Sequence, residues 1–76
     1  FNPSTNIRFD LPTASVVTLK VYDVLGQDVA TLVEGEYRDA GRYEVKFDAS
    51  QLGSGVYFYR ISAGTFNSIK KMLMLK

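Results

Sequence analysis

The chain has no cysteine and no histidine among its 76 residues. Without cysteine it forms no disulfide, and without either residue type it lacks the usual ligands of structural zinc, the commonest general base and the thiol nucleophile. Its apolar runs fall far short of the roughly 18 residues that a membrane-spanning helix needs. The net charge of +1 predicts no strong attraction to nucleic acid or to an anionic membrane. The stability of the folded chain must therefore come from packing.

The composition is that of one small folded domain. Of all residues, 46% are hydrophobic and 13% aromatic, which is far above the level of a disordered chain. We expect a single domain over residues 1–76. Because the chain begins at Phe1 rather than Met and shows no signal peptide, we expect it to be a fragment of a longer polypeptide. The absence of cysteine suits an exported protein as well as a cytosolic one.

Apolar residues recur at every second position, which is the period of a β-strand. The alternation is clear in "TNIRFDL", "SVVTLKVYDV" and "RYEVKFD". Strands are predicted near residues 5–11, 16–24, 28–33, 41–48, 55–63 and 65–75. The segments "EGEYRDAG" and "ASQLGSG" are predicted as connections, the second with space for one helical turn. The pattern predicts an all-β fold, a small antiparallel β-sandwich or barrel of six to seven strands. The predicted core comprises Leu19, Val21, Val45, Phe47, Ile61, Leu73 and either Tyr57 or Phe58.

The chain ends in "KKMLMLK", an apolar run between lysines. A tight turn at Gly64 is expected to pair this run with the strand at residues 56–62, so that it supplies the closing strand of the sandwich. The flanking lysines discourage edge-to-edge pairing with other chains. Tyr57 follows the corner "LGSG", and its hydroxyl is expected to bond back to the backbone of that corner.

Carboxylates and tyrosines are the remaining candidates for a site. The acids are scattered over turns and polar strand faces, without the D-x-D-x-D spacing of a calcium loop. They are Asp10, Asp23, Asp28, Glu34, Glu36, Asp39, Glu44 and Asp48. The sequence therefore predicts no enzyme, no cofactor and no fully ligated metal. The tyrosines could form a platform for sugars or single-stranded nucleic acid, although strand packing is the stronger interpretation. They are Tyr22, Tyr37, Tyr43, Tyr57 and Tyr59.

Four blocks of sequence carry a resemblance to a known family. They are "FNPSTNIRFDLP", "VTLKVYDVLGQDVATLVEGEY", "AGRYEVKFDASQLGSGVYFYRI" and "KKMLMLK", in that order. Together they resemble the C-terminal sorting domain of type IX secretion cargo over essentially the whole chain. The same string is similar to the immunoglobulin-like domain of the flagellar hook-capping protein. The resemblance implies an immunoglobulin-like β-sandwich.

The resemblance also implies a function for the domain. Such domains follow a cargo domain in a secreted chain, pass through the periplasm, and are recognised there as an address by the outer-membrane type IX translocon. A surface sortase then removes the domain and anchors the cargo to anionic lipopolysaccharide at the cell surface. Neither nucleic acid nor a small-molecule substrate is an implied partner. The implied recognition residues are the last ones: Lys70, Lys71, Met72, Leu73, Met74, Leu75 and Lys76.

A passive accessory module of a secreted enzyme is the alternative function. Such an immunoglobulin-like spacer or carbohydrate-binding module would share the fold completely, because a fold does not determine a function. Exposed aromatic residues in a row along a groove would favour that alternative. Buried tyrosines and an exposed final strand would favour sorting.

Overall fold

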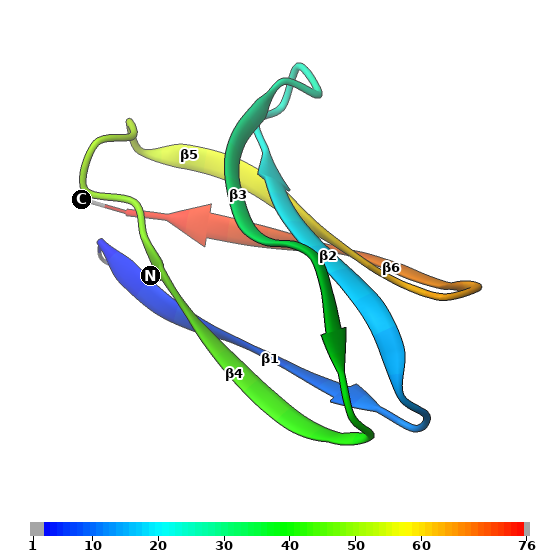
Figure 1. Cartoon of the computed structure of the whole chain (residues 1–76). Coiled ribbons are helices and arrows are strands. Elements are labelled where there is room, and N and C mark those ends of the chain that lie inside the picture. Colours follow the sequence, from blue (N-terminus) through cyan, green and yellow to red (C-terminus); the bar gives the residue numbers. More distant parts are fainter. Residues whose placement is uncertain (1–2, 76) are drawn as a thin grey trace.

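The computed structural model describes residues 3–75, which form six β-strands arranged in two layers (Figure 1). The strands are β1 (Ser4–Leu11), β2 (Ser15–Tyr22), β3 (Asp28–Arg38), β4 (Gly41–Asp48), β5 (Gly55–Ala63) and β6 (Phe66–Met74). β1 and β4 form a two-stranded sheet, and the other sheet has the order β3-β2-β5-β6. Every paired neighbour is antiparallel. The predicted antiparallel sandwich is therefore confirmed. The described residues include no helix that could span a membrane.

The core lies between the two sheets and follows the predicted alternation. Val17, Leu19 and Val21 of β2 are fully buried, and they face Ile7 and Phe47 of the two-stranded sheet within one cluster. Tyr57 rather than Phe58 is the buried member of the predicted pair in β5, and Ile61 is buried as well. Val45 is half-buried and packs against the same cluster. Alternate residues point to opposite sides of a strand, so one register places all these side chains inside.

β3 is longer than predicted, because the expected connection after residue 33 continues as strand. The register advances from Leu19↔Val33 to Val17↔Glu36, so β3 carries an extra residue at this point. Gly35 lies in this bulge with a φ of +59°, a conformation that glycine adopts without steric cost. The amide of Gly35 donates to Oγ1 of Thr18 at 3.1 Å. A glycine that resembles a turn signal in the sequence thus marks a bulge within a continuous strand.

The connection between β4 and β5 contains a turn and not the helical turn for which the sequence left space. The amide of Leu52 donates to the carbonyl of Ala49 at 2.9 Å. The hydroxyl of Tyr57 donates to the carbonyl of Gly53 at 2.7 Å, so the predicted bond from this tyrosine to its corner is confirmed. Tyr43 makes an equivalent bond to the carbonyl of Asp39 at 2.6 Å. Both tyrosines fix the start of a strand to the turn before it.

β5 and β6 form the predicted hairpin around Gly64, which has a φ of +61°. One core prediction is wrong, because Leu73 is 51% exposed, whereas its neighbour Met74 is fully buried. In the observed register Leu73 lies opposite Val56, and Met72 lies opposite the buried Tyr57. Methionines, not leucine, therefore point into the sandwich from this strand. An unbroken apolar run gives no alternation from which to choose the inward face.

Candidate functional site

The terminal segment is an edge strand of the four-stranded sheet. Among the described residues β6 has a single strand neighbour, β5, so it is the last strand of this sheet. Of the implied recognition residues, β6 contains Lys70, Lys71, Met72, Leu73 and Met74, and Leu75 follows it. Lys76 lies outside the described residues. The structure thus brings the described members together on one strand, where alternate side chains have opposite surroundings.

One set of terminal side chains belongs to the core and the other faces solvent. Met74 is buried and Met72 packs half-buried against the core cluster. Lys71 and Leu73 are exposed on the outer face, which is the side of the four-stranded sheet away from β1 and β4. Lys70 is exposed on the inner side, where the two-stranded sheet does not cover it. Buried and solvent-facing side chains therefore alternate along this one strand.

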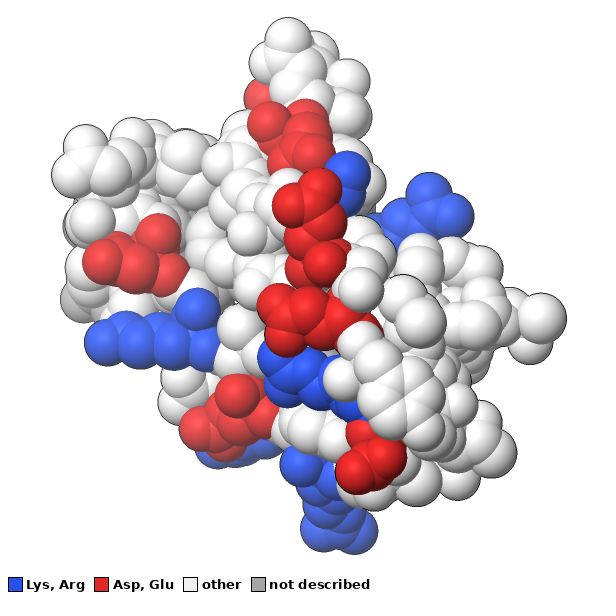
Figure 2. All heavy atoms as spheres, in the orientation of Figure 1, with Lys and Arg blue, Asp and Glu red and all other residues white. Residues whose placement is uncertain are grey.

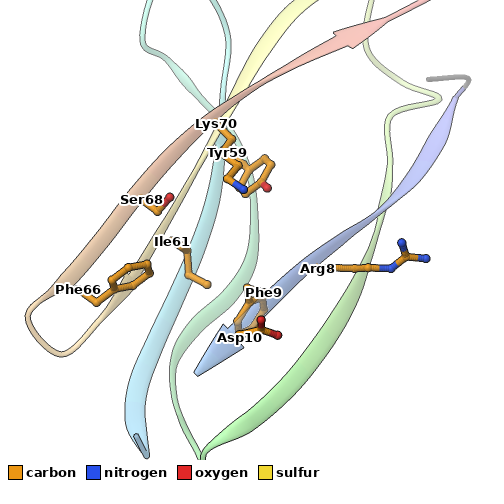
Figure 3. Close-up of a pocket in the computed structure, with 8 residues that line it drawn as sticks. All are labelled: Arg8, Phe9, Asp10, Tyr59, Ile61, Phe66, Ser68 and Lys70. Atoms are coloured by element: carbon orange, nitrogen blue, oxygen red, sulfur yellow. The ribbon is translucent and has the colours of Figure 1, made fainter. Parts of the chain in front are cut away.

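A groove opens between the edges of the two sheets, and we call it the inter-sheet groove. It encloses about 300 Å³ and is lined by Arg8, Phe9 and Asp10 of β1, Tyr59 and Ile61 of β5, and Phe66, Ser68 and Lys70 of β6 (Figure 3). Figure 3 shows Arg8 extending away from the groove, consistent with its ion pair to Glu44 at 2.8 Å. Of its aromatic residues, Phe9 is buried, Tyr59 is half-buried and Phe66 is 49% exposed, so their rings do not present equally exposed faces.

A second concave region, which we call the outer hollow, lies on the outer face. It encloses about 380 Å³. Its walls include Tyr22 and Val24 from β2 and the following turn, Phe58 and Arg60 from β5, and Ile69 from β6. The cross-strand register places Tyr22 opposite Phe58 and Arg60 opposite Ile69. An exposed apolar hollow of this kind has no role in the core of the sandwich.

Charge is divided between the two edges of the four-stranded sheet. Acidic side chains form a row along β3 (Figure 2), which carries Asp28, Glu34 and Glu36. The opposite edge carries Lys70 and Lys71, and neither lysine forms an ion pair within residues 3–75. The domain therefore presents a basic edge at its terminal strand and an acidic edge at β3.

Two charged groups have shifted ionisation, and both shifts have local structural causes. The hydrogen bond from the Arg8 guanidinium to Glu44 raises the pKa of Arg8. The amide of Ser50 donates to Oδ1 of Asp48 at 2.9 Å and lowers the pKa of that carboxyl below its ordinary 3.8. These groups fasten a strand pair and a turn. Neither shift points to acid–base catalysis, because catalytic groups are shifted toward neutral pH.

The remaining sequence candidates are dispersed or used in structural contacts. Over residues 3–75, acidic side chains do not gather in any group of three or more that could hold a metal ion. The hydroxyls of Tyr43 and Tyr57 are bonded to backbone carbonyls. Tyr37 is exposed, but it lies at the far end of the sheet, opposite Val16. Tyr22 lines the outer hollow and Tyr59 lines the inter-sheet groove, on opposite faces of the four-stranded sheet, so the described tyrosines do not gather into one platform.

The chain was also compared with known proteins. Residues 2–75 match the family model of the secretion system C-terminal sorting domain. The chain belongs to this family. It is thus a type IX secretion sorting domain, which associates with that secretion system and with an upstream cargo, in a secreted or cell-surface protein. No curated protein and no solved structure gives a significant match to the sorting domain.

Sequence reasoning missed the outer hollow of the sorting domain. Its members come from three segments, and only the pairing of β2 with β5 and of β5 with β6 brings them together. A signal was nevertheless present, because Ile69 stands out of phase with the inward Met72 and Met74 in "SIKKMLM". Only the contiguous apolar surface that Ile69 forms with Val24 and Phe58 indicates an interaction site, because single exposed apolar residues are common.

Proposed function

We propose that the sorting domain is a non-catalytic address recognised by the outer-membrane translocon through its terminal strand. The family match over residues 2–75 carries the proposal. The position of β6 as the last strand of its sheet supports it, because the side chains of Lys71 and Leu73 lie exposed on this strand. The proposed recognition residues are Lys70, Lys71, Met72, Leu73, Met74, Leu75 and Lys76.

The proposal extends to the fate of the cargo. The domain at residues 1–76 follows a cargo domain in a longer secreted chain and passes with it through the periplasm. After translocation a surface sortase removes the domain and anchors the cargo at the cell surface. Family membership supports these steps. Exposed lysines beside a rigid sandwich suit an address that is recognised in the folded state, because the fold holds them in fixed positions.

The placement of the aromatic residues favours sorting over a carbohydrate-binding accessory module. Sugar-binding surfaces need exposed aromatic faces in a row. Here Tyr57 is buried, Tyr43 stacks on Phe9 at 5.4 Å between ring centroids, and both hydroxyls are bonded to the backbone. Their aromatic surface is used for packing within the domain.

A lysine-to-alanine pair tests the address against a merely structural role for the terminal strand. The domain is fused behind an exported reporter in a host with the type IX machinery, and Lys71→Ala is combined with Lys76→Ala. Lys71 is exposed, so its replacement should cost within about 0.5 kcal/mol of stability. The matched control combines Arg42→Ala with Lys46→Ala, which removes the same charge from exposed positions of β4.

The expected result is that the folded terminal double variant accumulates in the periplasm, whereas the β4 control reaches the surface. Surface delivery of the terminal variant at the wild-type level, with an unchanged melting temperature, would show that these lysines are not the address. Removing residues 72–76 is a poorer test, because the loss of the buried Met74 also destabilises the domain.

A further inference from the structure

The turn between β2 and β3 holds apolar side chains in solvent by a set of hydrogen bonds. Oδ1 of Asp23 accepts from the amides of Leu25 and Gln27, each at 2.9 Å. The amide of Gly26 donates to the carbonyl of Asp23 at 3.0 Å, and Gly26 has a φ of +81°. Val24 is nevertheless 64% exposed, and Figure 1 shows the turn projecting beyond the body of the sandwich. Hydrogen bonds thus define the shape of the turn, while its apolar side chains Val24 and Leu25 lie exposed.

The β2–β3 turn and the terminal strand β6 both border the outer hollow. Val24 lines the hollow at one side and Ile69, which is 65% exposed, lines it at another. Phe58 lies between them on β5, and in the register it is the direct partner of Lys71. A single apolar surface therefore connects the β2–β3 turn to the proposed recognition residues of β6.

The electrostatic surroundings of the hollow are basic. Arg60 lines it and Lys71 stands beside it, and neither forms an ion pair within the described residues. The acids nearby are already engaged inside the domain. Asp23 accepts two amides of its own turn, and Asp28 pairs with Lys20 at 3.5 Å. The Arg60 guanidinium donates to Oδ1 of Asn67 at 3.2 Å, a neutral group that leaves its charge uncompensated. Arg60 and Lys71 thus offer two positive charges to an external partner, against the one carboxylate of Asp23 that lines the hollow.

We propose that the outer hollow and Lys71 form the docking surface for a translocon protein. The partner would place an apolar side chain in the hollow and carboxylates, on either side of that side chain, against Arg60 and Lys71. The inference rests on the proposed function and adds which side of the domain is recognised. A well-packed apolar anchor within a pocket, surrounded by charged contacts, is the arrangement that dominates protein–protein affinity. Charge complementarity selects an acidic partner for Arg60 and Lys71.

A protein suits this surface better than an anionic membrane. Membrane-surface binding through charge is worth about 1 kcal/mol per basic residue and relies on clusters of about four to eight. On the outer face Lys20 lies opposite Arg60 but is paired with Asp28, which leaves Arg60 and Lys71, fewer than such a cluster. The hollow of about 380 Å³, in contrast, has the concave form that accommodates a side chain.

Neighbouring lysines separate this surface from the inter-sheet groove. Lys71 is opposite Phe58 on the outer face, whereas Lys70 lines the groove on the inner side. Both are exposed, so either charge reversal should leave the fold intact. Lys71→Glu should reduce delivery of the reporter about tenfold, a change typical of a contact at an interface hot spot, and should reduce it more than Lys70→Glu does. Lys46→Glu, at an exposed position of β4, is the control that should leave delivery unchanged.

Two exposed valines, one in the β2–β3 turn and one in β2, provide a second matched pair. Val24 borders the hollow, whereas Val16 is 56% exposed near the opposite end of β2. Val24→Asp should reduce surface delivery about tenfold, and Val16→Asp should not. If Val24→Asp lowers the melting temperature, Val24→Ser takes its place. Ile69→Lys should deliver more reporter than Ile69→Asp, because an acidic partner repels the aspartate.

The wild-type fusion distinguishes a failure of the sorting function from a failure of the outer-face proposal, and a vesicle control distinguishes a protein partner from a membrane. If the wild-type fusion is not delivered, the proposed function fails. If it is delivered and Lys71→Glu and Val24→Asp are delivered equally well, sorting stands and the outer-face proposal is wrong. A loss with Lys70→Glu alone would assign recognition to the groove. Co-sedimentation with vesicles containing phosphatidylglycerol should show no binding; binding that Lys71→Glu abolishes would replace the protein partner by a membrane.

Discussion

Met74 and Leu73 are adjacent in β6, yet the structure predicts very different costs for replacing them with alanine. Met74 is fully buried, and truncating a buried methionine to alanine costs about 2–5 kcal/mol. The whole domain has roughly 4–11 kcal/mol of stability if each of its 76 residues contributes the usual share. Met74→Ala should therefore remove a large fraction of it. Leu73 is 51% exposed, so Leu73→Ala should cost within about 0.5 kcal/mol.

Thermal unfolding followed by far-ultraviolet circular dichroism measures this difference. For a domain of this size 1 kcal/mol corresponds to about 4–8 °C, so Met74→Ala should lower the melting temperature by at least about 8 °C and Leu73→Ala by no more than about 4 °C. A one-residue slip of β6 would exchange the two faces. A larger loss for Leu73→Ala than for Met74→Ala would therefore refute the register in which Met74 lies opposite Gly55.

Three further predictions concern the corner, the acid limit of stability and the bulge. Tyr57→Phe removes the hydrogen bond to the corner backbone and should lower the free energy of unfolding in urea by about 0.5–1.5 kcal/mol. The control Tyr37→Phe, at a 66% exposed site, should leave this free energy almost unchanged. Equal losses for the two variants would contradict a special role for Tyr57. Because the pKa of folded Asp48 is depressed below 3.8, its ionised form stabilises the fold above that pH, and this stabilisation is lost as the pH falls through the folded pKa. The difference in unfolding free energy between the wild type and Asp48→Ala should therefore shrink in acid titrations. A difference that stays constant with pH would count against the bond from Ser50. Gly35→Ala should destabilise by about 1 kcal/mol, because alanine is strained at a φ of +59°, and a stabilising effect would exclude the bulge.

The sequence predicted the strands and the inward faces wherever polar and apolar residues alternate. Ile7, Phe9 and Leu11 are all buried because their polar neighbours leave one possible face. Prediction failed at the terminal run, where Leu73 and Met74 are equally apolar and only the pairing with β5 decides which is buried. Local composition carries no information on such long-range pairing.

Only the part of the candidate site that lies in consecutive residues could be predicted from the sequence. The terminal segment could be singled out, since its lysines and its resemblance lie within consecutive residues. The outer hollow could not, because Val24, Phe58 and Ile69 are brought together by strand order. The bulge at Gly35 likewise depends on the partner strand, since its amide bonds to Thr18 across the sheet. Positions defined by pairing become visible only in the folded structure.

The central claim is that this domain directs an attached protein through the type IX secretion system. The most direct test fuses residues 1–76 behind an exported reporter and measures the fraction of reporter outside the cell. The measurement compares a host that has the translocon with an isogenic host that lacks it. We predict delivery to the surface or medium in the first host and retention inside the outer membrane in the second. Equal reporter distribution in the two hosts would contradict the claim.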